Sequence, residues 1–585
     1  MNEYNIQNIV SEKCMIFVCS TTGQGDEPEN MKIFWKFLLR KNLPPKLLSS
    51  LRFAVLGLGD SSYVKFNFAA KRLNKRLTQL GANMLIPLGL ADDQHDLGYD
   101  AVVDPWIDSL YKELLGLYPL PDGITPSNIT DTLVPRWSIT AYVGSNKFGN
   151  QSMYYSTRAA EEFTVTVKEI QRTTSDNHFQ DVRLVKLETE GQRYIPGDVV
   201  VIRPRNSVER VNEFQNLLRS NGIDIPPNTI LKISEIDPDV PVPTPLHYQV
   251  SFQQLCEEYF DLNAVPRRHF FQILSLLTDS EIEKEKLEEF VTAEGQNDLY
   301  NYCNRPRRNI VEILQDFPHA LKNVTKEVLF DIFPPIKPRE FSIASSFTAH
   351  SNEIHILLGV VRYKTKLVKE RLGLCSNYLA NLKVRDQISV WIKKGSFKFP
   401  NDNVPVILVG PGTGMAPFRN FICEREQENG ASASNIIFFF GCRGRDLDFH
   451  CKEDFVRLEH ENKIKLICAF SREQDYKVYV QHRILENGEL VWNTLKNRNA
   501  YIYIAGNAKN MPQQVREAFV DVCKIHGGMT ADESQRFIEN MERCEFPNLI
   551  FFQARGEKRQ NFQFLNWGPT NAGLRNLDYV NIFYC

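Results

Sequence analysis

Residues 404–418 read VPVILVGPGTGMAPF, an apolar run that leads into a glycine-rich turn and then into the start of a helix. Continuous Val, Ile and Leu are typical of a strand that is buried on both faces of a parallel sheet. Glycines in such a turn let the backbone approach a pyrophosphate closely, and the helix N-terminus stabilises its charge. Glycine-rich turns after strands are common, so the interpretation depends on the motifs that surround this one.

Hydroxyl and basic residues follow a later strand of the same region. Ser471 and Arg472 come directly after the apolar run 464–470, and residues 477–481 read KVYVQ. A hydroxyl, a guanidinium and an ammonium at the carboxyl end of a strand suit the ribose phosphate that distinguishes NADPH from NADH. The alternative is a solvated loop with ordinary charges. Together these runs predict a doubly wound α/β domain over residues 401–543 that binds NADPH.

The strands of residues 161–400 follow a different pattern. Runs such as 163–172, 353–363 and 386–394 alternate apolar and polar residues. Short alternating strands without helices between them are typical of an antiparallel β-barrel. A helix-rich insert at about 208–330 interrupts this pattern, so we expect a barrel with a helical insert.

Two motifs of the predicted barrel point to FAD. Residues 339–342 read REFS, in which the aromatic ring can stack on a flavin while the arginine pairs with its pyrophosphate. Residues 373–376 read GLCS and supply small side chains and backbone donors beside a helix start. Each motif is unremarkable by itself.

Residues 1–118 again alternate strand and helix patterns. Apolar runs at 15–19, 53–57 and 84–88 are separated by helix candidates, which predicts an open parallel sheet covered by helices. A stretch rich in Pro, Gly, Ser and Asn follows at 119–160, and we expect it to be a linker.

Composition favours a soluble, cytoplasmic protein. The 585 residues carry 69 basic and 71 acidic side chains, a net charge of -2 that gives no reason to expect nucleic-acid or membrane-surface binding. The 12 cysteines form no CxxC pair, so we expect free thiols in a reducing compartment and no metal site. No apolar run approaches the roughly 20 residues that span a bilayer.

The order of the motifs is more specific than any one of them. RxFS, GLCS, GPGTGMAPF, SR and then KxYxQ, over roughly 162–543, resembles the ferredoxin–NADP reductase superfamily. The N-terminal domain, the helical insert and the runs TTGQGD, LGLGDSSYVKFN, DDQHDLG, CNRPRR and AFSRE narrow the resemblance to the diflavin reductases, and within them to the cytosolic branch that serves iron–sulfur protein assembly. The resemblance implies that residues 1–118 are flavodoxin-like, that electrons pass from NADPH to FAD to FMN, and that the acceptor is the iron–sulfur protein anamorsin.

The resemblance also implies roles for matching residues. Two loops would bind FMN, with Tyr63 stacking on its ring and Asp93 nearby: Ser20, Thr21, Thr22, Gly23, Leu58, Gly59, Asp60, Ser61, Ser62, Tyr63, Val64, Lys65, Phe66, Asn67 and Asp93. FAD positions are Arg307, Arg339, Glu340, Phe341, Ser342, Gly373, Leu374, Cys375 and Ser376, and NADPH positions are Thr413, Ser471, Arg472, Lys477, Val478, Tyr479, Val480 and Gln481. Ser342 is the candidate catalytic residue, since its hydroxyl would lie near the hydride path. The alternatives are a packed surface aromatic at Tyr63, a plain turn at Thr22 and a solvated loop at Asp93.

Both ends of the chain depart from the diflavin pattern. Family members open with a strand and a phosphate-binding loop of the SxTGTA kind, whereas this sequence starts at a later point of the pattern. We therefore expect residues 1–118 to bind FMN weakly or not at all. Residues 544–585 leave the pattern, and no motif places Trp567 or Tyr584 over the FAD ring. Ala505 stands where many relatives carry a cysteine near the nicotinamide.

Three functions are compatible with this sequence. The first is an NADPH-dependent diflavin reductase. The second is a reductase that uses FAD alone and fails with acceptors that require FMN. The third is a catalytically weak variant that acts by binding the acceptor.

Overall fold

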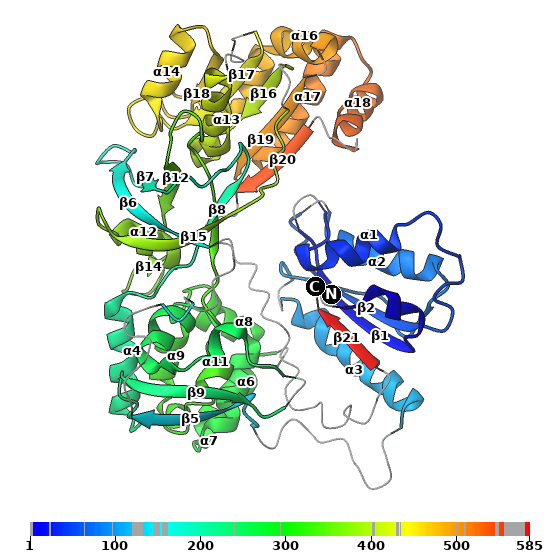
Figure 1. Ribbon diagram of the computed structural model, residues 1–585, viewed down its shortest axis with the longest axis vertical. Coiled ribbons are helices and arrows are strands. Elements are labelled where there is room, and N and C mark those ends of the chain that lie inside the picture. The colour runs from blue at the N-terminus through cyan, green and yellow to red at the C-terminus, as the bar shows by residue number, and fades with distance from the viewer. Residues whose placement is uncertain are drawn as a thin grey trace.

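The computed structural model describes most of the chain. It describes residues 4–22, 25–63, 65–95, 98–119, 133–143, 152–154, 162–237, 240–292, 294–400, 404–428, 432, 434–498, 500–507, 510–543, 549–554 and 580–584. The three kinds of unit expected from the sequence are confirmed: a parallel sheet, an antiparallel sheet with an insert, and a second parallel sheet (Figure 1).

The N-terminal unit is built on the parallel strands β1 (Cys14–Ser20), β2 (Arg52–Gly59) and β4 (Gly89–Asp92), with the short β3 (Asn83–Met84) beside β2. Side chains of β1 alternate between two cores. One core lies under α1 (Lys32–Leu38) and α2 (Phe68–Gln79), and the other lies under α3 (Asp100–Leu117).

The third strand of this unit differs from the expected run 84–88. Regular pairing resumes only at Gly89, because Pro87 lies within the run and has no N–H to donate to a ladder. Its carbonyl instead accepts the indole N–H of Trp106 at 3.0 Å. The strand that leads to Asp93 is therefore β4.

The tail beyond residue 543, which we expected to lack a pattern, contributes a strand to each parallel sheet. β20 (Leu549–Ala554) pairs with β19 (Tyr501–Asn507), and β21 (Val580–Tyr584) pairs in parallel with β1 (Figure 1). The register of the second pair runs from Cys14↔Val580 to Val18↔Tyr584. A sheet edge exposes unpaired backbone groups, and both strands add to such an edge.

The expected linker also contains a strand. β5 (Trp137–Val143) pairs with β9 (Thr229–Glu235), which pairs in turn with β10 (Val250–Ser251). Sequence reasoning missed β5, because the turn-forming residues on both sides hid its alternation. This small sheet packs on the helices of the insert, which are α4 (Val208–Ser220), α5 (Phe252–Gln254), η5 (Leu255–Tyr259), α6 (Arg268–Leu277), α7 (Glu281–Glu289), α8 (Gln296–Leu299), η6 (Tyr300–Asn304), α9 (Ile310–Asp316), α10 (Pro318–Lys322) and α11 (Leu329–Ile332).

The central sheet is antiparallel and barrel-like. Its six strands follow the order β11-β8-β15-β6-β7-β12, and only an isolated bridge, Ile343↔Ile356, joins the two ends, so the described strands form no continuous closed ladder. α12 (Leu374–Asn381) packs against the last strand. The strands are β6 (Phe163–Arg172), β7 (Asp181–Glu188), β8 (Val199–Ile202), β11 (Arg339–Ser342), β12 (Glu353–Val360) and β15 (Gln387–Lys393), and the short β13 (Arg362–Tyr363) and β14 (Arg371–Leu372) pair beside them.

The last unit is a parallel sheet in the order β18-β17-β16-β19-β20. The chain starts at the central β16 (Val406–Val409), moves outward to β17 (Ile436–Cys442) and β18 (Lys465–Phe470), and returns to β19 on the other side. A reversal of strand order opens a crevice at the carboxyl ends of the strands. Its helices are α13 (Ala416–Gln427), α14 (Lys452–His460), α15 (Val480–Glu486), α16 (Gly488–Arg498), α17 (Met511–Gly527) and α18 (Ala531–Arg543).

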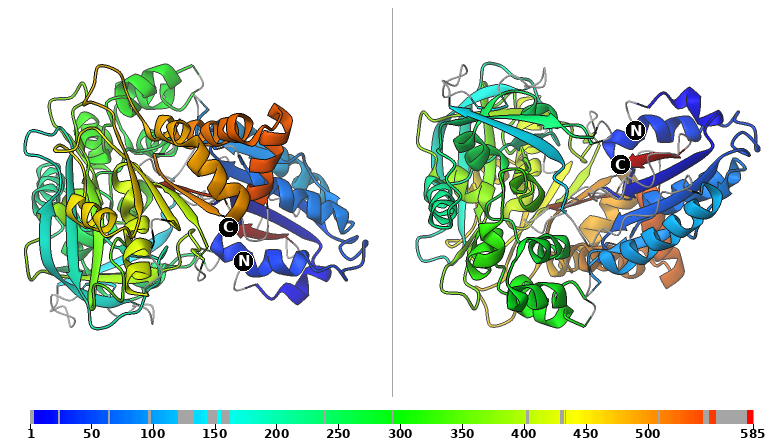
Figure 2. Two further views of the ribbon diagram at one scale, coloured as in Figure 1. Left: turned by 90° about the horizontal axis from the view of Figure 1, so that it is seen from above. Right: turned by 90° about the horizontal axis from the view of Figure 1, so that it is seen from below.

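The antiparallel sheet and the last unit share one apolar core. Val182, Leu184 and Ala344 of the former pack with Leu408 and Phe418 of the latter. The N-terminal sheet stands to one side of both (Figure 2). Asp104 of α3 forms an ion pair with Arg268 of the insert. None of the described helices combines the length and the apolar character needed to cross a membrane.

Candidate functional site

The glycine-rich turn after β16 lies against the end of β19. A Cβ added at Gly414 would lie 2.3 Å from the carbonyl oxygen of Ala505, so only glycine allows this approach. Gly412 has φ +57° and open space where a side chain would lie. The turn continues as the 3₁₀ helix η7 (Gly412–Met415) and then as α13. The turn is thus packed against β19 at Gly414 and open at Gly412. An open glycine-rich turn before a helix fits a pyrophosphate.

The predicted phosphate-binding residues lie at the carboxyl end of β18. The backbone N–H of Ser471 donates to the carbonyl of Cys442, and that of Arg472 donates to the carbonyl of Arg443, each at 2.9 Å. These bonds attach the turn to the end of β17. Arg472 and Lys477 are exposed and cationic, so they can meet an anion at this edge.

Residues 477–481 divide into two groups. Val478 and Val480 are buried in the core beside β17, so their side chains cannot contact a dinucleotide. Tyr479 is exposed and precedes α15, and Gln481 donates from Nε2 to Oε1 of Gln514 at 3.2 Å. Within the predicted motif, Lys477 and Tyr479 are therefore the exposed side chains that a ligand can reach.

The REFS motif forms β11, which pairs antiparallel with β8. Arg339 donates from Nη1 to the carbonyl of Lys337 at 2.7 Å, and Glu340 pairs with Lys393 at 2.9 Å. Phe341 and Ser342 are half-buried, and Phe341 packs against the barrel core. Both side chains are therefore partly accessible, so a flavin can contact them.

The GLCS motif starts α12, with Gly373 as the residue before the helix. Cys375 and Ser376 are buried, and Oγ of Ser376 accepts the N–H of Val361 at 3.1 Å. Their side chains therefore shape the turn from inside, and its backbone is the part that can meet a phosphate.

Arg371, which sequence reasoning missed, ties this turn to the loop that carries Arg307. Its Nη1 lies 2.8 Å from Oε1 of Glu312, and its Nε donates to the carbonyl of Pro306 at 3.3 Å. Its Nη2 is buried without a hydrogen-bond partner among the described residues, and Arg307 beside this contact has φ +60°. An unpartnered, buried guanidinium N–H next to Gly373 fits a phosphate of FAD. No sequence signal distinguishes this arginine from others.

The first flavodoxin-type loop uses its side chains within the protein. Oγ1 of Thr21 accepts the N–H of Ala69 at 3.2 Å, and the hydroxyl of Thr22 faces the carbonyls of Asp26 and Glu27 at 3.3 and 3.2 Å. Ser20, the last residue of β1, is half-buried. The predicted Gly23, like Val64 of the second loop, lies outside the described residues.

The second loop is held by carboxylates and by Asn67. The N–H of Ser61 donates to Oδ1 of Asp92 at 2.8 Å, and that of Ser62 donates to Oδ1 of Asp60 at 2.9 Å. Asn67 is buried with φ +52° and donates from Nδ2 to the carbonyl of Ala91 at 2.9 Å. It therefore anchors the loop.

Leu58 and Gly59 end β2, and a Cβ at Gly59 would lie 2.6 Å from Oδ1 of Asn67. Lys65 is exposed, whereas Tyr63 and Phe66 are half-buried. The half-buried ring of Tyr63 can still meet a flavin.

Asp93 and Tyr99 lie at the contact between the N-terminal unit and the helical insert. The guanidinium of Arg267 lies 4.4 Å from the centroid of the Tyr99 ring, and Arg268 forms an ion pair with Asp104. Burial raises the pKa of Asp93, although the charge of Arg267 acts the other way. Burial and the charges of Arg267 and Arg339 lower the pKa of Lys337 to about 8. The charges of Arg267, Lys337 and Arg339 thus form one group that extends from Asp93 to the REFS strand.

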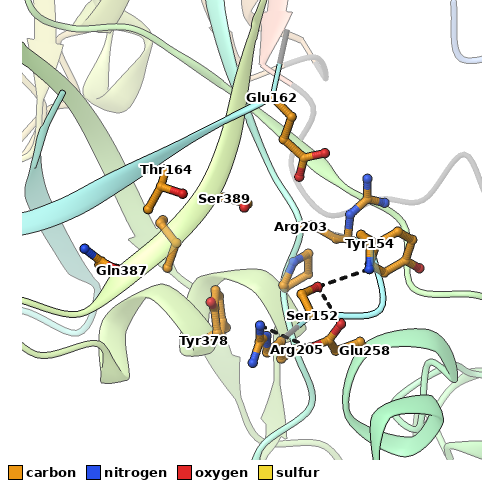
Figure 3. A pocket seen from close by; sticks show the side chains of 12 residues that line it. Ser152, Tyr154, Glu162, Thr164, Arg203, Arg205, Glu258, Tyr378, Gln387 and Ser389 are labelled. Carbon is orange, nitrogen blue, oxygen red and sulfur yellow. Dashed lines mark hydrogen bonds and ion pairs between the residues drawn. The ribbon is translucent and has the colours of Figure 1, made fainter. Parts of the chain in front are cut away.

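A polar cavity of about 200 Å³ lies between the antiparallel sheet and the insert (Figure 3). The guanidinium carbon of Arg203 lies 3.8 Å from the centroid of the Tyr154 ring. Nη2 of Arg205 lies 3.1 Å from Oε1 of Glu258. Tyr378 of α12 completes the wall. None of the predicted cofactor residues lines it.

Comparisons with known proteins match each unit in turn. A family model described as flavodoxin matches residues 1–106, one described as FAD binding domain matches residues 156–378, and one described as oxidoreductase NAD-binding domain matches residues 408–517.

Several relatives match over most of this chain. The chain is 45% identical over 563 residues to NADPH-dependent diflavin oxidoreductase 1 of Xenopus laevis, covering 93% of this chain and 92% of the relative. It is 46% identical over 555 residues to the protein of that name from Danio rerio, with the same coverage. The Arabidopsis thaliana protein is 35% identical over 572 residues, covering 91% of this chain and 90% of the relative.

Proposed function

This chain belongs to the family of the NADPH-dependent diflavin oxidoreductases, and on that premise we propose that it carries electrons from NADPH through FAD and FMN to the iron–sulfur protein anamorsin, in cytosolic iron–sulfur protein assembly. The oxidoreductase class and the three cofactors follow from the family. The acceptor, the cytoplasmic location and the residue roles are our proposals.

One observation supports the hydride-transfer half of this function above all. Ala344, two residues after Ser342, lies in the same core as Met415 of the glycine-rich turn and Ala505 of β19. The FAD strand, the pyrophosphate turn and the strand end expected at the nicotinamide therefore meet at one place. Binding both reactants in one geometry removes much of the entropic barrier to their reaction.

We assign the binding residues from their placement. Arg339, Arg371 and the Gly373 turn would hold the FAD phosphates, and the Phe341 ring would contact its flavin. The open turn at Gly412–Met415 would hold the NADPH pyrophosphate, with Arg472 and Lys477 at its ribose phosphate. When bound, NADPH supplies a hydride and the flavins pass its electrons on singly. The protein places these groups, and the Ser342 hydroxyl offers a hydrogen bond beside the reacting atoms.

The contact between α3 and α6 supports transfer onward to FMN. Arg267 and Arg268 attach the N-terminal unit on the side of its second flavin loop, next to the charges around Arg339. We propose that this contact presents the FMN loops to the FAD strand. A partner protein would then accept electrons from the exposed FMN edge.

A second function, reduction by FAD alone, is favoured by a specific observation. Backbone N–H groups of Thr22, Ser61 and Ser62 already donate within the protein, so these described donors are not available to an FMN phosphate. Such an enzyme would reduce ferricyanide but not an acceptor that requires FMN.

Steady-state kinetics separate these functions. We expect NADPH-dependent reduction of ferricyanide, of a one-electron protein acceptor and of the clusters of purified anamorsin. Reduction of ferricyanide alone would support the FAD-only enzyme. Absence of all three activities in FAD-loaded protein would overturn the proposal and favour a variant that acts only by binding the acceptor.

A further inference from the structure

Arg419 is a buried charge at the boundary between the FAD-binding sheet and the NADPH-binding unit. It lies in the first turn of α13, four residues after Met415, and is 5% exposed. The surrounding core is apolar and includes Ala344, Phe418 and Ile422. Burial of a guanidinium is costly unless its N–H groups are hydrogen-bonded, so its partners are informative.

One half of the guanidinium is bound within the NADPH unit. Nε of Arg419 donates to Oδ2 of Asp454 at 2.7 Å, and Nη2 lies 2.6 Å from the same oxygen. Asp454 belongs to the first turn of α14. This pair fixes the direction in which the fork of the arginine points.

The other half reaches the FAD-binding sheet. Nη1 donates to the carbonyl oxygen of Ala344 at 2.8 Å and lies 3.3 Å from Nδ1 of His355. Ala344 follows the REFS strand, and its own N–H donates to the carbonyl of His355 at 2.8 Å. The arginine thus contacts the segment that follows β11 and also contacts β12, where the two ends of the barrel-like sheet meet.

The histidine is arranged to accept this bond. Nε2 of His355 lies 2.6 Å from Oε2 of Glu353, which is the geometry of an N–H donor to a carboxylate. With the proton on Nε2, the neutral ring has an unprotonated Nδ1 that faces Arg419; this tautomer is assigned from the hydrogen-bond network. Burial lowers the pKa of His355 to about 3, in keeping with a neutral ring.

His350 contacts the same guanidinium in a different way. Its Nε2 lies 3.4 Å from Nη2 of Arg419, while its Nδ1 accepts the N–H of Ser346 at 3.1 Å. A neutral ring cannot accept at both nitrogens, so this contact is one of packing. The directional bonds of Arg419 to the FAD-binding sheet are therefore those to Ala344 and His355.

We propose that Arg419 is a positioning residue for hydride transfer: its fork fixes the end of the flavin strand against the NADPH pyrophosphate turn. Apolar surfaces can slide over one another at little cost, whereas a planar fork that binds a carboxylate and a carbonyl at once permits one arrangement. Ser342 lies two residues before Ala344, and the last residue of η7 lies four residues before Arg419. A displacement of Arg419 would therefore move the segments proposed to contact both reactants. This inference needs only the NADPH–FAD half of the reaction and not the proposed acceptor.

A purely structural role would consist of joining α13 to α14. Arg457 offers a matched control, because it also joins them, through Glu426 at 2.6 Å, but lies on the exposed surface and bonds no residue of the barrel in the described structure. Arg457→Met therefore removes an α13–α14 bond of the same kind without touching Ala344.

The test compares Arg419→Lys, Arg419→Met and Arg457→Met in the full-length, FAD-loaded enzyme with ferricyanide as acceptor. Lysine keeps the charge but cannot bond Asp454 and Ala344 together. We expect the rate of flavin reduction by NADPH, followed by stopped-flow absorbance, to fall roughly 10- to 100-fold in both Arg419 variants, since small misplacements of reactants have effects of that order. We expect KM for NADPH to change less than about twofold, because the binding residues remain.

Two further readouts distinguish positioning from loss of stability. The deuterium isotope effect with NADPH labelled at the transferred hydrogen should rise in the Arg419 variants and stay unchanged in Arg457→Met. Amide hydrogen exchange at residues 343–355 should speed up in the former alone. Hydride transfer and exchange that match the native enzyme in Arg419→Lys, or an equal loss in Arg457→Met, would overturn the proposal. If Arg419→Met does not fold, Arg419→Lys decides the question.

Discussion

The guanidinium of Arg267 lies 4.4 Å above the ring of Tyr99, and this contact joins two units that are distant in sequence. Tyr99 precedes α3 of the flavodoxin-like unit, and Arg267 precedes α6 of the insert. A cation over a half-buried aromatic ring, together with the neighbouring Arg268–Asp104 ion pair, favours one docked arrangement of the two flavin sites.

Loss of this contact should impair transfer between flavins and spare hydride transfer. We expect Arg267→Ala to weaken docking by about 1 kcal/mol, or about fivefold in equilibrium, and to lower reduction of a one-electron protein acceptor accordingly. Reduction of ferricyanide should be unchanged, provided that FAD is its donor. Arg219→Ala, in α4 on the other side of the insert (Figure 1), serves as the control. An equal loss with both acceptors would contradict the docking role.

Flavin content should be unequal. FAD has the buried Arg371 and the Gly373 turn, whereas the N–H groups of Thr22, Ser61 and Ser62 in the two FMN loops donate to protein oxygens. We expect purified protein to carry close to one FAD and clearly less than one FMN. Chromatography of the released flavins measures this directly, and one tightly bound FMN per chain would refute the expectation.

Arg371 should matter for both stability and FAD binding. Arg371→Met would leave the carboxylate of Glu312 almost buried without its partner, which typically costs about 3 kcal/mol or more. The double variant Arg371→Met/Glu312→Gln removes the charge as well, and we expect it to recover stability but not FAD affinity. Thermal unfolding and titration of the apoprotein with FAD report the two effects separately. Full FAD affinity in the double variant would show that Nη2 does not contact the cofactor.

Coenzyme preference should depend on Arg472. If its guanidinium binds the ribose phosphate, Arg472→Ala removes a charge-assisted contact of about 1.5–3 kcal/mol, which corresponds to roughly 10- to 100-fold in KM for NADPH. KM for NADH should hardly change, so the ratio of the two values is an internal control. Parallel changes with both coenzymes would place Arg472 outside the phosphate site.

Stability should fall on mild acidification because of His355. Burial lowers its pKa to about 3, whereas a histidine in the unfolded chain titrates near 6.5. Between these two pH values the unfolded state binds more protons than the native state. The contribution of His355 to the unfolding free energy is therefore complete above about pH 6.5 and is lost as the pH falls. Glu353, whose pKa is about 2 because hydrogen bonds from His355 and Lys168 outweigh its partial burial, adds a loss only below about pH 4.5. Denaturant unfolding of native protein and of His355→Gln at pH 7 and 5 should show a smaller decrease in the variant.

The classes of the three units can be predicted from short stretches of sequence, because the patterns that distinguish them are local. Strand periods of two residues, continuous apolar strands and glycines before a helix are properties of short segments. They identified β16 and its turn, the alternating strands of the barrel-like sheet, and the succession of strands and helices in the N-terminal unit. β5 lies among turn-forming residues and β20 lies in the divergent tail. The sequence did not predict either strand, because each is defined by its partner strand.

The pairing of charged side chains, by contrast, depends on how distant segments pack. Arg371, Arg267 and Arg419 look alike in the sequence, yet one meets Glu312 near the Gly373 turn, one covers Tyr99, and one links Asp454 to the carbonyl of Ala344. Conversely, Val478, Val480 and Asn67 fit a binding motif in the sequence but lie in the core. The partner of a charged side chain and the exposure of a motif residue both depend on packing between segments that lie tens to hundreds of residues apart. No local sequence pattern contains that information.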